Sequence, residues 1–124
     1  MVEAALTVLI FFTLVFVTIE FGRALNVYHT ITDAAREGAR YAVAPFPGTT
    51  NYPTAGQVQS FAQNYLNAAA VKGAKVSVST LTQPVDGVNT TFTQVQITAP
   101  YNFTALPFLG KLNLSTTSVM RNEQ

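Results

Sequence analysis

The feature that most constrains this chain is an uninterrupted apolar run close to its start. No residue from Ala4 to Ile19 is charged, and Glu3 and Glu20 stand at the two ends of the run. As an α-helix, the run would rise about 24 Å, slightly less than the roughly 30 Å hydrocarbon core of a bilayer. The run therefore predicts a helix that is apolar on every side, unlike an ordinary surface helix.

One carboxylate and three threonines limit what can surround this helix. A carboxylate near the end of a buried helix is costly unless a cation pairs with it, so Glu3 predicts a cationic partner. A secretory signal peptide is an alternative interpretation of the run, but such a peptide begins with a basic region, and the first charge here is acidic. The helix also contains Thr7, Thr13 and Thr18. These threonines are compatible with an apolar setting because their hydroxyls can bond to main-chain carbonyls one turn back.

The helix is expected to continue well beyond the apolar run. No proline occurs before Pro45 and Pro47, which end the helix near residue 44. Polar residues recur at steps of three and four and form one stripe, namely Arg23, Asn26, Thr30, Asp33, Glu37 and Arg40. Apolar residues are expected on the opposite side, namely Phe21, Leu25, Tyr28, Ile31, Ala35 and Ala42. At a spacing of three, Asp33 can pair with Arg36 within the helix.

The following residues predict a second helix and a hairpin. The helix fits Thr54 to about Val71, with Thr54 as its N-cap and Gly73 as its stop. Alternation of apolar and polar residues then predicts two strands over residues 75–81 and 91–99, joined by a turn.

A third strand completes the expected fold. It ends near Arg121, and Pro100 and Pro107 bound an irregular stretch before it. Three strands expose one apolar face, which the second half of the long helix and the second helix can cover. The expected class is α+β. It has a helical spine over about residues 1–44 and a small head over residues 45–124, in which one helix packs on a three-stranded antiparallel sheet.

Composition and motifs argue against several classes of function. Charged residues make up 10% of the chain and the formal net charge is +1, which disfavours electrostatic binding of nucleic acid. The absence of cysteine removes disulfides and thiolate metal sites. His29 is the only histidine, and no catalytic constellation can be assembled around it. The sequence therefore predicts no catalytic residue, no cofactor, no metal site and no enzyme.

Three segments resemble one protein family. The stretch from Val2 to Val43 is similar to the N-terminal helix of TadE-like pilins, which are pseudopilin-type proteins of the tight-adherence (Flp) branch of type IV pilus systems. The motifs IEFGRAL at 19–25 and AAREGARYAV at 34–43 are the most specific, and SVMRNE at 118–123 resembles the family's C-terminal strand. The similarity is weaker between about residues 49 and 91.

The resemblance implies a type IV pilin-like fold and a history in the membrane. A prepilin peptidase would cleave the chain at the cytoplasmic membrane, and an ATP-driven assembly platform would draw it from the inner membrane into an extracellular helical filament on the cell surface. In type IV pilins, the N-terminal glutamate pairs with the α-amino group of a neighbouring subunit, and Glu3 is the matching position. That glutamate usually stands fifth in the mature chain, so either Met1 is not the mature N-terminus or the geometry differs. Because no leader is present, the chain is expected to be processed or trimmed.

Two functions stay open at this point. The first is a structural pilin that polymerises with copies of itself into a filament for surface attachment. The alternative is a membrane-anchored minor pseudopilin or binding module that primes assembly or recognises a ligand without forming the bulk of the fibre. The first is favoured because a plain tether needs neither Glu3 nor the charged stripe. The residues expected to act in assembly are Glu3, Glu20, Arg23, Asp33, Arg36, Glu37 and Arg40.

Overall fold

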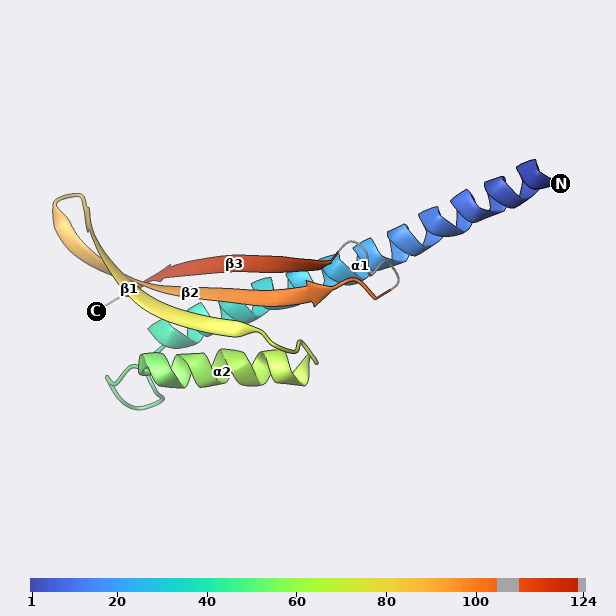
Figure 1. Cartoon of the computed structure of the whole chain (residues 1–124). Coiled ribbons are helices and arrows are strands. Elements are labelled where there is room, and N and C mark those ends of the chain that lie inside the picture. The colour runs from blue at the N-terminus through green and yellow to red at the C-terminus, as the bar shows by residue number, and fades with distance from the viewer. Residues whose placement is uncertain (105–109, 123–124) are drawn as a thin grey trace.

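The chain folds into a long helix that carries a small head on its second half (Figure 1). The computed structural model describes residues 1–104 and 110–122, so Pro107 and Glu123 lie outside the described residues. The elements are α1 (Val2–Val43), α2 (Ala55–Ala68), β1 (Lys75–Val85), β2 (Val88–Asn102) and β3 (Lys111–Arg121). The strands form one antiparallel sheet in the order β1-β2-β3, which confirms the predicted α+β class with a helical spine.

The two halves of α1 have different surroundings. In Figure 1 the N-terminal half extends away from the head, whereas the second half runs along the sheet. The helix ends at Val43, close to the predicted end, and Ala44 is extended with φ −89° and ψ 123°. Pro45 explains this end, because the residue before a proline is driven out of the helical region.

The core lies between one face of the sheet and the two helices, as predicted. Its fully buried residues come from every layer and include Ile31, Ala34, Ala35, Ala39, Val58, Ala62, Leu66, Val95, Ile97 and Ala99. Gly38 faces α2 and β2 at close range, because a Cβ at this position would lie in contact with the Ala62 Cβ at 3.4 Å and with Val95 Cγ1 at 3.5 Å. Small residues on α1 therefore hold both helices against the sheet.

The predicted apolar face of α1 is only partly correct. Ile31, Ala35 and Ala42 are buried as expected, but Phe21, Leu25 and Tyr28 are 41–63% exposed. A helix buries only one stripe against a sheet, and here the stripe follows the alanines and glycine that permit the closest packing. The large side chains lie on the neighbouring flank of the helix.

The ends of α2 follow side-chain and main-chain capping rules. Thr54 is the N-cap as predicted and forms a capping box with Gln57. The helix ends at Ala68, earlier than the predicted Val71. Ala70 takes a left-handed conformation with φ 58°, its N–H donates to the Asn67 carbonyl, and the Val71 N–H donates to the Leu66 carbonyl. This is a Schellman motif, in which an alanine holds the position expected of glycine.

The sheet register explains why a proline is tolerated inside β2. The Asn122 N–H donates to the Thr91 carbonyl, so by antiparallel alternation the odd-numbered residues of β2 hydrogen-bond to β3 and the even-numbered ones face β1. Pro100 therefore faces β1, beyond Lys75, where that strand begins. No ladder bond is lost, and β2 continues to Asn102, so the predicted irregular stretch begins later than expected.

A tight turn joins β1 to β2. Asp86 and Gly87 have φ values of 52° and 80°, as a type I′ turn requires, and Val85 pairs with Val88 across it. Because β3 ends opposite Phe92, the described residues place no third strand beside residues 82–91, which form a two-stranded ribbon. Figure 1 shows this ribbon curving away at the end of the head farthest from the N-terminus.

Candidate assembly interface

The apolar half of α1 is not covered by any part of the subunit that the structure describes. Its large side chains between Leu6 and Ile19 are 37–65% exposed. By length and composition α1 can cross a membrane, and none of its most apolar window is buried. The predicted threonine bonds are confirmed, because Thr7, Thr13 and Thr18 each donate to the carbonyl four residues earlier at 2.8–2.9 Å. This half can therefore lie in lipid, or among other apolar helices, without an unsatisfied hydroxyl.

Glu3 stands in the first turn of this helix. It is exposed, and its backbone carbonyl accepts the Thr7 hydroxyl. Within the described residues its carboxylate forms no hydrogen bond or ion pair with another side chain. A carboxylate on the first turn is favoured by the helix dipole, but in an apolar bundle it would still need a cation.

Glu20 is buried where α1 enters the head. It is 2% exposed, although it directly follows the apolar run. The Tyr101 hydroxyl donates to Glu20 Oε2 at 2.7 Å, and the Thr104 main-chain N–H donates to Oε1 at 3.1 Å. The Arg23 guanidinium lies 3.4 Å from Oε1 and stays mostly exposed. Glu20 thus joins α1 to the end of β2 and the residues after it through charge-assisted hydrogen bonds.

The Tyr101 hydroxyl makes the stability of this junction between α1 and the end of β2 sensitive to pH in the alkaline range. Burial of the ring raises the pKa of the Tyr101 hydroxyl above its usual value of 10.0, and the hydrogen bond to the Glu20 carboxylate raises it further. The neutral phenol therefore stabilises the folded state below pH 10, and this contribution is lost as the pH rises from 10 through the folded-state pKa.

We expect the free energy of unfolding to fall more steeply above pH 10 in the natural chain than in Tyr101→Phe. Denaturant unfolding of both proteins across this pH range is the measurement, and parallel pH profiles would contradict it.

The remaining charged residues of the predicted stripe lie on the surface of α1. Arg40 donates twice to the Glu37 carboxylate, with the shorter distance 2.8 Å. Asp33 and Arg36 are exposed, and among the described residues no ion pair joins them, so the pairing considered for them is not formed. The structure thus brings Glu20 and Arg23 to the junction between α1 and the end of β2, and it leaves Asp33, Arg36, Glu37 and Arg40 on the surface of the helix.

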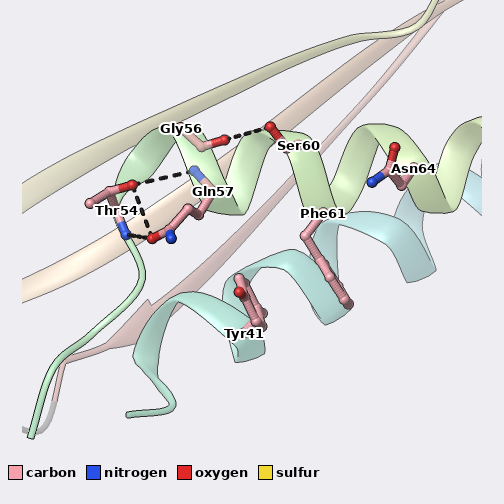
Figure 2. A pocket seen from close by; sticks show the side chains of 7 residues that line it. All are labelled: Tyr41, Thr54, Gly56, Gln57, Ser60, Phe61 and Asn64. Carbon is pink, nitrogen blue, oxygen red and sulfur yellow. Dashed lines mark hydrogen bonds between the residues drawn. The ribbon is translucent and has the colours of Figure 1, made fainter. Parts of the chain in front are cut away.

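A shallow depression lies between α1 and α2 (Figure 2). The Tyr41 and Phe61 rings stack across it with centroids 4.6 Å apart. Its polar side chains serve α2, because Thr54 and Gln57 cap the helix and the Ser60 hydroxyl donates to the Gly56 carbonyl. Over residues 1–104 and 110–122, no group of histidine, aspartate and glutamate side chains could hold a metal ion.

The comparison with known proteins bears on α1. Residues 1–40 match the family model of TadE-like proteins. The resemblance predicted from the sequence is therefore confirmed over these residues, which include most of α1. No curated protein and no solved structure matches the chain. The TadE-like match includes the apolar run, Glu20 and the charged stripe through Arg40.

Two residues of the junction were not found from the sequence. Tyr101 and Thr104 are more than 80 positions away from Glu20, and no local sequence pattern links either residue to it. The available signal was Glu20 itself, because a carboxylate at the end of an apolar run needs donors nearby. Which donors it meets depends on the course of β2 past Pro100.

Proposed function

We propose that this chain is a structural pilin subunit that polymerises through α1 into an extracellular Tad-like type IV filament. Its partners would be copies of itself, the prepilin peptidase and the assembly platform. Before assembly it would sit in the inner membrane, and afterwards at the cell surface as part of an attachment fibre. The proposed role is structural, without a reaction, cofactor or nucleic acid.

One observation carries this proposal. The apolar half of α1 is uncovered, and the other half of the same continuous helix is a fixed part of the head. Lipid tails and a bundle of identical helices are both apolar, so one surface suits the membrane before assembly and the filament core afterwards. Transfer from water contributes roughly 1.5–3 kcal/mol for each large side chain fully buried, which would make such a fibre hard to dissociate.

Charged residues would guide the docking of subunits. We assign Glu3 to pairing with a cation of a neighbouring subunit, the α-amino group being the candidate that the family resemblance supplies. The outward residues Asp33, Arg36 and Arg40 are proposed as contacts between subunits. Exposed ion pairs contribute only about 0–1 kcal/mol, so these contacts would select the docking geometry more than hold the fibre together.

Glu3→Ala is expected to lower the yield of fibres strongly while leaving the head folded. The carboxylate lies far from the core, and its removal would leave the cation of the neighbouring subunit buried without a partner. The measurement is the amount of fibre sheared from cells, compared with the amount of chain in the membrane. Glu3→Asp retains the charge and should keep most of the yield. Normal fibres from Glu3→Ala would show that the pairing does not exist.

Mass spectrometry of purified surface fibres tests the function itself. A structural pilin is expected to be the dominant component, and the same experiment locates its mature N-terminus. If the chain is found only in trace amounts, the alternative of a minor pseudopilin that primes assembly takes its place. If it is absent from fibres and remains in the membrane, the alternative of an anchored binding module is favoured.

A further inference from the structure

The head carries an exposed apolar strip beside β3 that its own core leaves uncovered. Phe21, Leu25, Tyr28 and Thr32 follow one another at steps of four and three, so they lie along one line of α1. Thr32 shows that this line of α1 lies next to β3, because its hydroxyl is 3.5 Å from the Thr116 hydroxyl. Leu112 extends the strip, since it pairs with Tyr101 and shares its face of the sheet. The four apolar members, Phe21, Leu25, Tyr28 and Leu112, are 41–63% exposed and are called the strip below.

β3 is an edge strand, and no other strand of the described residues pairs with the edge next to the strip. The Asn122 N–H bonds to β2, and successive residues of an antiparallel strand point their main-chain groups to opposite sides. The odd-numbered residues of β3 therefore direct their main-chain N–H and C=O groups away from β2. This edge contains no proline, and its two charged residues, Lys111 and Arg121, stand at its ends, so the stretch between them lacks the usual devices that block strand addition. The opposite edge of the sheet, formed by β1, is less able to accept another strand, because Gln59 donates to the Val76 carbonyl and Pro84 lacks an N–H. An open strand edge beside apolar side chains suits a β-structured partner better than a helix.

The ribbon at the other end of the head has the complementary properties. Val85 and Val88 at its tip and Leu81 at its base are 37–66% exposed. Asp86 is the only charged residue of the ribbon, whereas the charged residues of β3 are Lys111 and Arg121, both basic. The register places the ribbon and Lys111 at opposite ends of the sheet, so they cannot meet within one subunit.

We infer that the ribbon tip of one copy docks on the strip of a second copy, with Asp86 of the ribbon near Lys111. The contact buries apolar side chains from both surfaces and brings opposite charges together. Two copies with parallel α1 helices would meet in this way when displaced along the helix axis by about one head length. The two surfaces differ, so the contact is heterologous and leaves a free surface at each end for further copies. Because it joins copies of one chain, it rests on the proposed polymerisation.

Cysteine cross-linking of the full chain tests the contact. The chain has no natural cysteine, so Val88→Cys on the ribbon and Leu25→Cys on the strip give a clean background. With a short bis-maleimide, the double variant is expected to form a ladder of dimers, trimers and larger species in sheared fibres and in membranes. Each single variant alone should stay monomeric, and the two single variants expressed together should stop at dimers. Lys72→Cys combined with Val88→Cys is the control, because Lys72 is exposed and lies outside both surfaces.

Charge reversal provides an independent measurement. Asp86→Lys and Lys111→Asp should each lower the ladder yield several-fold, and the two together should restore it. A missing ladder in both fibres and membranes would overturn the docking, as would a dimer from Val88→Cys alone, which would mean that tips meet tips. Electron microscopy of the natural chain separates the two proposals. Fibres without a ladder refute only the ribbon contact, and a ladder in membranes without fibres refutes only the filament.

Discussion

A fragment that begins at Thr18 is expected to fold into a soluble head, whereas a fragment that begins at Thr49 is expected to be largely unfolded. The difference lies in the second half of α1, which the shorter fragment lacks. That half supplies much of the core, namely Ile31, Ala34, Ala35, Ala39 and Ala42. Without it, the buried face of β2 around Val95 and Ile97 would be open to water.

The magnitudes favour this outcome. Full burial of one side chain such as Ile31 contributes roughly 1.5–3 kcal/mol, and several alanines and their packing contacts are lost with it. A whole domain is stable by only about 5–15 kcal/mol. The longer fragment keeps these contacts, omits most of the apolar run, and starts with a threonine, which is a good N-cap.

Circular dichroism, size-exclusion chromatography and amide NMR spectra of the two fragments are the measurements. Ile31→Ala in the longer fragment is an internal check, and it should cost about 2–5 kcal/mol of unfolding free energy if this residue anchors the core. Dispersed amide signals and cooperative unfolding of the Thr49 fragment would show that α2 and the sheet form a sufficient core by themselves.

The sequence was most informative where the signal is local. The length of α1 follows from the apolar run, the continued helical spacing and Pro45, all of which lie within one segment. The existence of the strands follows from alternation, although β1 (Lys75–Val85) and β2 (Val88–Asn102) extend into the predicted turn and beyond the predicted end at residue 99. The N-cap of α2 follows from Thr54 and Gln57. Each of these features depends on neighbours in the chain, so propensity and periodicity were sufficient.

Features that depend on packing were less predictable. Periodicity identified an apolar side of α1, but the sheet selected the small residues of that side and left Phe21, Leu25 and Tyr28 outside. Pro100 suggested the end of a strand, yet its missing N–H faces a place where β1 has not begun. Only the register of the three strands reveals this, and the register is a long-range property.

The candidate site shows the same division. Glu3 and the stripe were found from their positions on one helix. The burial of Glu20 against Tyr101 could not be predicted from the sequence, because the two residues meet only after the sheet has formed. The predicted roles of these residues in assembly stay predictions.

Glu20→Ala is expected to destabilise the head by about 2–4 kcal/mol, because it removes a buried carboxylate and leaves the Thr104 N–H without this acceptor. Glu37→Ala is the matched control. Glu37 lies on the same helix and also pairs with an arginine three residues later, but its side chain is 41% exposed against 2% for Glu20. Since exposed pairs contribute only about 0–1 kcal/mol, the control should unfold almost as the natural chain does. Chemical unfolding of the full-length chains in detergent is the measurement.

Glu20→Gln separates the charge from the shape of this side chain. With the amide oxygen on the Tyr101 hydroxyl, the amide nitrogen would face the Thr104 N–H and two donors would oppose each other. In the flipped orientation the amide oxygen accepts the Thr104 N–H and the nitrogen donates to the Tyr101 hydroxyl oxygen, whose own proton can turn to the main-chain carbonyl of residue 20, so both contacts are kept without the carboxylate charge. We expect an intermediate loss of about 1–3 kcal/mol, together with earlier hydrogen exchange at Thr104 than in the natural chain. Equal stability of Glu20→Ala and Glu37→Ala would mean that the carboxylate does not hold α1 to β2. If Glu20→Gln matched the natural chain in both measurements, the junction would depend on the shape of the side chain, and its charge would be dispensable for folding.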